Sequence, residues 1–200
     1  ISKEGIKLAV QTLKTRWIGQ GPKVDLFEKT FKKKFLYNKL SALAVGSGTD
    51  ALHLAYLLAG IKKGDEVLVP VFTCTATNLP LLYIGAKPVF LDIDTSTMNI
   101  NLREVEKKIT KKTKAIVCVD YGGIPNDYKK LQKICKKYNL KLISDAAHSL
   151  GSKYLGKYAC VYADFTTFSF QAIKTLTTGD GGLLVIKDNK LIEKAKRLRW

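Results

Sequence analysis

Short apolar runs alternate with amphipathic segments along most of this chain. β-Branched and other apolar residues fill five runs, at 41–45, 66–70, 87–92, 114–120 and 139–144, and two further runs lie at 163–170 and 181–187. Their almost continuous hydrophobicity predicts short strands that are buried on both faces, as in a parallel sheet covered by helices.

The segments between these runs show helical spacing of apolar residues. They predict helices over 49–60, 75–84, 102–109 and 127–138, with Asn126 as the N-cap of the last one. Residues 1–40 are predicted to form an N-terminal helical segment of two helices, separated by the Gly/Pro-marked connector "WIGQGPKV". The alternation of strands and helices predicts a three-layer α/β sandwich around a mostly parallel, seven-stranded sheet over residues 41–200.

The C-terminal stretch "NKLIEKAKRLRW" predicts a helix that stops without a C-cap glycine or a polar tail. We therefore expect the chain to be truncated or incomplete. Its 200 residues suit one domain or slightly more, and a hydrophobic content of 46% is sufficient for a sizeable core. No apolar run approaches the roughly 20 residues of a membrane-spanning helix, and no signal-peptide pattern opens the chain. The expectation is a soluble, cytoplasmic protein.

The cysteines and the charge bear on function. Cys74, Cys118, Cys135 and Cys160 are scattered without the spacing of a zinc site, so we expect reduced thiols and no metal centre. A net charge of +17 raises the alternative of a basic nucleic-acid-binding domain. However, most lysines alternate with apolar residues at helical spacing, which is typical of the solvated face of amphipathic helices. We favour that interpretation and expect neither a nucleic-acid partner nor a membrane span.

Candidate chemistry follows the ends of the predicted strands, where ligands bind in open α/β sheets. Gly48 and Thr49 lie in a small-residue turn that opens a helix, which is either a phosphate cradle or an ordinary connection. Asp145 ends a buried strand, where a carboxylate requires a partner, whether a structural one or a ligand. His148, three residues later, could contact the same ligand, whereas His53 inside a predicted helix is better explained by packing.

Lys174 completes this set. It lies in "DFTTFSFQAIKTLTTGDGG", after an apolar strand and before a loop of threonines and glycines. A lysine desolvated in such a loop can have a lowered pKa and act as a nucleophile toward carbonyls. An aldehyde cofactor with a phosphate arm and a basic ring nitrogen needs a lysine, a carboxylate and a helix N-terminus. Each of these features is ambiguous alone, but together they favour pyridoxal phosphate.

Several longer segments of the chain together resemble a known protein family. The segments "GQGPKVDLFEKTF", residues 45–94, "SDAAHSLGS" and "FSFQAIKTLTTGDGGLLV" resemble the DegT/DnrJ/EryC1/StrS family of nucleotide-sugar aminotransferases, which have the aspartate-aminotransferase fold (fold type I). The resemblance runs nearly end to end. It implies that Lys174 forms the Schiff base with the cofactor and moves protons, and that Asp145 pairs with the ring nitrogen. Ser169, Gly48 and Thr49 would hold the phosphate, and His148 would lie near the ring hydroxyl.

The resemblance implies less definite roles for three other positions. Trp17 lies in a segment that the family uses near the substrate or the dimer interface, and Gln171 stands where His or Tyr is also common. Cys74 stands where many members carry an aromatic residue that stacks on the cofactor ring. Stacking must then be weaker or come from elsewhere, for example from Phe72. A related dehydratase branch has histidine in place of the lysine, so Lys174 favours transamination.

The resemblance therefore implies transamination of a nucleotide-linked keto sugar, of the 4-keto-6-deoxyhexose class, with L-glutamate as amino donor. It also implies a homodimer with composite active sites and a small C-terminal domain that this chain lacks. A catalytically idle fragment that retains the fold remains an alternative. It would take up pyridoxal phosphate without reacting with glutamate.

Overall fold

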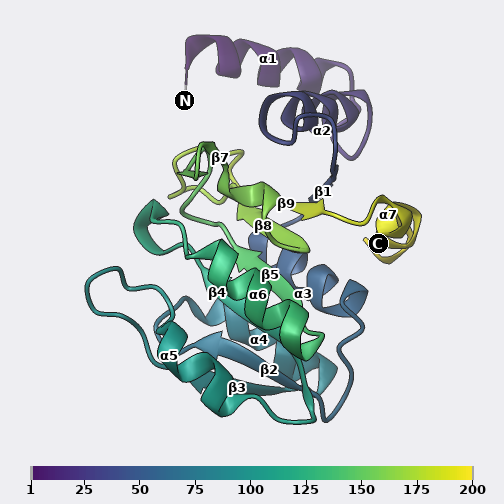
Figure 1. The fold of residues 1–200 in the computed structure, drawn as a ribbon. Coiled ribbons are helices and arrows are strands. Elements are labelled where there is room, and N and C mark those ends of the chain that lie inside the picture. Colours follow the sequence, from purple (N-terminus) through teal and green to yellow (C-terminus); the bar gives the residue numbers. More distant parts are fainter. Residues whose placement is uncertain (1, 200) are drawn as a thin grey trace.

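The computed structural model describes residues 2–199 and contains one large sheet (Figure 1). Its strands are β1 (Ser41–Val45), β2 (Glu66–Pro70), β3 (Lys87–Leu91), β4 (Thr113–Val119), β5 (Lys141–Asp145), β8 (Phe165–Ser169) and β9 (Gly182–Ile186). They lie in the order β1-β9-β8-β5-β4-β2-β3. A separate hairpin pairs β6 (Lys153–Tyr154) with β7 (Lys157–Tyr158). The predicted seven-stranded sheet is confirmed, and each of its seven strands falls within two residues of its predicted bounds, whereas the β6–β7 hairpin was not predicted.

The sheet is parallel apart from one strand. β9 runs antiparallel to both of its neighbours, β1 and β8, while β8, β5, β4, β2 and β3 pair in parallel. Since β1 and β8 are both antiparallel to β9, they are parallel to each other. Consequently the carboxyl ends of β1, β8, β5, β4 and β2 all lie at one edge of the sheet.

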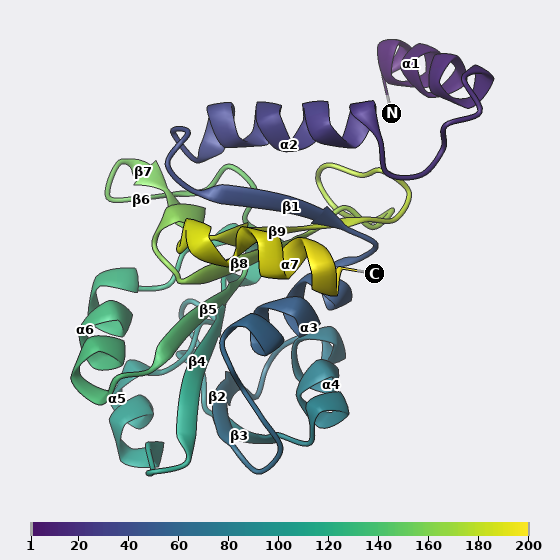
Figure 2. The same cartoon turned by 90° about the vertical axis from the view of Figure 1, so that its right-hand side faces the viewer.

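Helices cover both faces of the sheet. They are α2 (Pro22–Phe35), α3 (Gly48–Leu58), α4 (Thr75–Ile84), α5 (Leu102–Val105), α6 (Tyr128–Tyr138) and α7 (Ile192–Leu198), whereas α1 (Lys3–Lys14) lies apart from the sheet. Figure 2 shows α5 and α6 on one side of the sheet and α3, α4 and α7 on the other. This arrangement is the predicted three-layer sandwich.

Three apolar clusters fill the space between the layers. One packs α3 against the sheet face that carries Leu43, Val67 and Val117. A second packs α6 against the opposite face. The third lies under α2, where Phe31 contacts the ring of Phe168. α1 contributes to none of them, because none of its residues is buried. Among residues 2–199, no helix combines the length and the apolar character needed to cross a bilayer.

Two local predictions were wrong. The N-cap of α6 is Asp127, whose side chain accepts a hydrogen bond from the Lys130 N–H, and not Asn126. Asn126 is buried instead, and its amide donates to the Val119 carbonyl and to Asp120. The helix predicted over 102–109 is α-helical only to Val105 and continues as a 3₁₀ turn over Glu106–Lys108.

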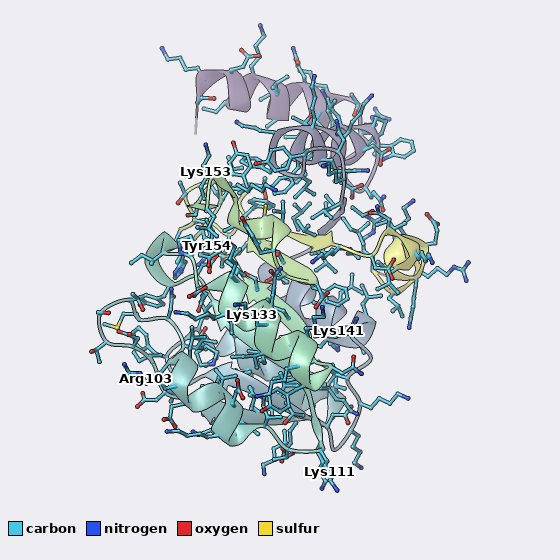
Figure 3. All side chains as sticks on the ribbon, viewed as in Figure 1. Arg103, Lys111, Lys133, Lys141, Lys153 and Tyr154 are labelled. Carbon is cyan, nitrogen blue, oxygen red and sulfur yellow. The ribbon has the colours of Figure 1, made fainter. Side chains whose placement is uncertain are left out.

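Basic side chains are spread over many elements. Figure 3 labels five of them on one face of the molecule, from α5, α6, β5, β6 and the turn before β4: Arg103, Lys133, Lys141, Lys153 and Lys111. α6 illustrates the pattern, because all of its lysines are exposed while Leu131, Ile134 and Cys135 are buried. The positive charge therefore lies on the solvent side of amphipathic elements, as the sequence pattern indicated.

Candidate active site

The carboxyl edge of the sheet brings together segments far apart in sequence. β1 leads into the Gly46–Gly48 turn, β5 ends at Asp145, and β8 ends at Ser169. Val119, the last residue of β4, pairs with Asp145 of β5. The N-terminus of α3 therefore lies at the same edge as a buried carboxylate.

Asp145 is 6% exposed and is held at both oxygens. Its Oδ2 accepts a hydrogen bond of 2.8 Å from the Thr77 hydroxyl, and its Oδ1 accepts one of 3.1 Å from the Ala147 N–H. Burial raises the pKa of Asp145 above its ordinary value, although these two hydrogen bonds and the charges of His148 and Lys174 act in the opposite direction. No cation lies within ion-pair distance of this carboxylate among the described residues. A buried acid in this state is suited to a cationic ligand atom.

The loop of Lys174 follows Ser169, the last residue of β8, and β8 pairs with β5 beside Asp145. Lys174 lies close enough to Asp145 and His148 for its charge to lower the pKa of both groups. Lys174 is half-buried in a loop, and its N–H donates to the Gln171 carbonyl. Two hydrogen bonds tie this loop to the residue after β8, because Thr177 Oγ1 and the Thr178 N–H both donate to the Phe170 carbonyl.

The first turn of α3 lies against the end of β8. A Cβ atom added to Gly48 would come within 2.8 Å of the Cβ of Ser169, so glycine permits this close approach. Ser47 caps the helix by accepting a hydrogen bond from the Asp50 N–H. The N–H groups of a first helical turn have no partners within the helix, and the helix dipole favours an anion there. The Gly48 and Thr49 N–H groups and the Ser169 hydroxyl therefore lie together at a helix N-terminus that is suited to an anion.

His148 lies beside an aromatic pair. Its Nδ1 accepts a 3.4 Å hydrogen bond from the Gly122 N–H, which leaves Nε2 as the protonated nitrogen of the neutral ring. Partial desolvation, followed by the charge of Lys174, lowers the pKa of His148. The Tyr121 ring contacts both His148, at 5.5 Å between centroids, and Phe72, at 4.7 Å. His148 is therefore a neutral hydrogen-bond donor at this edge.

Three predicted positions have less definite surroundings. Cys74 is an exposed free thiol at the N-cap of α4. The Gln171 side chain accepts a hydrogen bond from the Ile173 N–H within its own loop. Trp17 is 62% exposed, and its indole N–H donates to the Gln20 carbonyl. The adjoining segment lines a cavity of about 600 Å³ together with Gly181 and Gly182, but Trp17 itself does not.

The structure also contains site features that the sequence did not indicate. Thr77 was noted only as part of the hydroxyl-rich stretch after β2, yet its hydroxyl contacts Asp145, which is 68 positions away. A second buried acid, Asp120, accepts hydrogen bonds from Asn126, Tyr128 and Ser149. No sequence signal identifies these pairings, because they depend on which strands become neighbours in the sheet.

Together, these groups fit pyridoxal phosphate. The cofactor requires an amine, a carboxylate and an anion cradle, and Lys174, Asp145 and the Gly48–Ser169 contact supply them at one edge. The carboxylate is buried without an ion-pair partner, and the cradle is one that a side chain at Gly48 would fill. His148 lies close enough to Asp145 for its charge to act on the carboxylate, and its ring contacts that of Tyr121.

Comparisons with known proteins agree with this geometry. The model of the DegT/DnrJ/EryC1/StrS aminotransferase family matches residues 1–200. A GDP-perosamine synthase from Escherichia coli O157:H7 is 42% identical over 186 residues, which cover 92% of this chain and 50% of that protein. The structure of PseC from Helicobacter pylori, an aminotransferase of pseudoaminic acid biosynthesis, is 35% identical with a TM-score of 0.91. It covers 98% of this chain and 53% of that one.

The sugar aminotransferase Spr1654 from Streptococcus pneumoniae, described as putative in its PLP-form structure, is 34% identical with a TM-score of 0.88. The match covers 100% of this chain and 54% of that chain. The chain thus spans about half the length of the curated relatives it matches.

Proposed function

The chain belongs to the DegT/DnrJ/EryC1/StrS aminotransferase family, and we propose that its protein transfers an amino group to a nucleotide-linked keto sugar with pyridoxal phosphate as cofactor. The observation that carries this proposal is the convergence of Lys174, Asp145 and His148 at the carboxyl edge of the sheet. The phosphate cradle at Gly48 and Ser169 adjoins them.

Each residue has a distinct role in this proposal. Pyridoxal phosphate, when bound, supplies an aldehyde and a ring that withdraws electrons from the substrate carbon. Asp145 holds the proton on the ring nitrogen through a charge-assisted hydrogen bond. The first turn of α3 and the Ser169 hydroxyl bind the phosphate. His148 donates its Nε2 proton to the ring hydroxyl.

Lys174 holds the cofactor before the substrate binds. Once released, its Nζ carries the proton that leaves the α-carbon of the amino donor, and it later returns a proton to the sugar carbon. A positioned amine in this role contributes about 100- to 10,000-fold to the rate.

The substrate class rests on the relatives. The GDP-perosamine synthases and PseC support a nucleotide sugar as amino acceptor, and we propose a 4-keto-6-deoxyhexose with L-glutamate as donor. We further propose a homodimer with composite active sites. Ile173 and Leu176 support it, because both are exposed apolar side chains on the Lys174 loop.

Borohydride trapping tests the central assignment. The intact protein is incubated with pyridoxal phosphate, reduced with borohydride, digested and analysed by mass spectrometry. We expect the label on the peptide that contains Lys174 and its absence from the Lys174→Ala variant. Lys187→Ala, which removes an exposed lysine at the end of β9, serves as control and should retain the label. A label on another lysine, or none at all, would refute the assignment.

A further inference from the structure

Two threonine hydroxyls form a hydrogen-bond chain that ends on Asp145. Thr77 lies in the first turns of α4 and is fully buried. Its Oγ1 is 2.8 Å from Asp145 Oδ2 and 2.7 Å from the Oγ1 of Thr73. Threonine hydroxyls inside helices usually bond back to the carbonyl one turn earlier. The Thr77 hydroxyl instead contacts a carboxylate on a different element.

The direction of this chain follows from the chemistry of its members. Burial raises the pKa of Asp145, while the hydrogen bonds it receives and the nearby charges favour the ionised form. An ionised carboxylate only accepts hydrogen bonds, so Thr77 donates its single proton to Asp145. The contact between the two hydroxyls then requires Thr73 to donate to Thr77. Successive donors polarise one another, so the first hydroxyl strengthens the second as a donor.

The rest of α4 is anchored independently of this hydroxyl. The Tyr56 hydroxyl of α3 donates to the Thr77 carbonyl at 2.6 Å, and α4 packs against α3 through buried apolar residues. Asp145 has its own backbone support, because β5 pairs with both β4 and β8. The hydroxyl chain is therefore not required to build either element. What it adds is the orientation of the carboxylate.

We propose that Thr77 is a positioning residue, which, with Thr73 behind it, fixes the plane and the charge of the Asp145 carboxylate for the ring nitrogen of the cofactor. Thr77 holds one oxygen and the Ala147 N–H holds the other. The carboxylate keeps accepting capacity on both oxygens for a ligand N–H. This inference rests on the proposed function for the identity of the ligand but not for the contact itself.

Substitutions can separate the effect of the Thr77 hydroxyl from the effect of its side-chain packing. Thr77→Val keeps the shape and removes the donor, whereas Thr77→Ser keeps the donor and removes a methyl group. Thr73→Val breaks the first link at a half-buried position, outside the buried core. Thr166→Val is the matched control, because the fully buried Thr166 of β8 donates to the Cys160 carbonyl and does not contact Asp145.

The first measurement needs no cofactor. The carboxyl carbon of Asp145 is titrated by ¹³C NMR in the intact apoprotein, in which His148, Lys174 and the buried Tyr56 are the titratable groups that act on it. Thr77→Val should raise the titration midpoint by roughly 1 to 2 pH units, since it removes a hydrogen bond to a charged group. Thr77→Ser and Thr166→Val should leave the midpoint unchanged, and Thr73→Val should shift it less and in the same direction as Thr77→Val.

The second measurement is the affinity for pyridoxal phosphate. Thr77→Val should weaken binding about 10- to 100-fold, and Thr77→Ser should restore it. An unchanged midpoint and affinity in Thr77→Val would overturn the inference. If Thr77→Val does not fold, an unshifted midpoint in Thr73→Val overturns it instead. Should the unsubstituted protein fail to bind pyridoxal phosphate, the proposed function fails, while the NMR titration still decides the role of Thr77.

Discussion

Replacing Gly182 with alanine tests the phosphate cradle through the strand beneath it. Gly182 begins β9 and pairs with Val45 and Ser169, the last residues of its two neighbouring strands. An added Cβ would lie 2.1 Å from the Ser47 carbonyl oxygen and 2.4 Å from its carbon. Both atoms belong to the backbone of the turn before α3, so no side-chain rotation relieves the clash.

The size of the effect follows from these distances. Ordinary contact between heavy atoms begins at about 3.5 Å, so the Ser47–Gly48 turn must move by roughly 1 Å or more. Forcing an extra methyl group into a packed site costs about 1–3 kcal/mol of stability. A shift of this size also takes phosphate hydrogen bonds out of their range of about 2.7–3.2 Å. We expect about 10- to 100-fold weaker binding of pyridoxal phosphate, because the lost bonds are to a charged group.

Two comparisons make the assay specific. Binding is titrated by absorbance for pyridoxal phosphate and for pyridoxal, which lacks the phosphate. Gly182→Ala should weaken binding of the first and leave binding of the second unchanged. Gly46→Ala is the control in the same turn, because its Cβ would meet only the tip of the Asp50 side chain, which can rotate away. The reasoning is refuted if Gly182→Ala binds pyridoxal phosphate like the unsubstituted protein, or if both ligands lose affinity equally.

Three further outcomes follow. Because burial raises the folded-state pKa of Asp145 above its ordinary value, the folded apoprotein binds this proton more tightly than the unfolded chain. The free energy of unfolding should therefore fall as pH rises from about 4 through the raised pKa, and urea titrations of Asp145→Asn should show a shallower fall. His148→Gln should keep cofactor affinity within about threefold, because an amide N–H can replace the Nε2 donor, whereas His148→Leu should lose it. In the native protein, a thiol reagent should modify the exposed Cys74 rapidly and react with the three buried thiols only on unfolding. Burial raises the pKa of Cys135 and Cys160 to about 12 and that of Cys118 well above its ordinary value.

Apolar patterning was sufficient to predict the seven strands of the large sheet, because each is a short run rich in apolar residues, although the edge strand β3 is partly exposed. The direction of β9 was not predictable in this way, since a buried strand has the same composition whichever way it runs. The N-cap of α6 was misassigned because Asn126 and Asp127 are both good caps, and only the fold turns Asn126 toward Asp120. Lys174 and Asp145 were proposed as site residues from the sequence because their surroundings in it are unusual. Thr77 was not, because its partner lies on a distant strand.

Two buried aspartates show how the structure distinguishes a carboxylate that can still bind a ligand from one whose hydrogen bonds are all made within the fold. Asp120 and Asp145 both follow buried apolar runs, and the backbone N–H of Asp120 donates to the Asp145 carbonyl. An ionised carboxylate can accept about four hydrogen bonds. Asp120 receives four, two from Asn126 and one each from Tyr128 and Ser149. Asp145 receives two. Asp120 is therefore saturated by the fold and holds the loop beside the site. Asp145 retains unfilled accepting capacity in a buried place, and unfilled capacity of that kind is costly unless a ligand uses it.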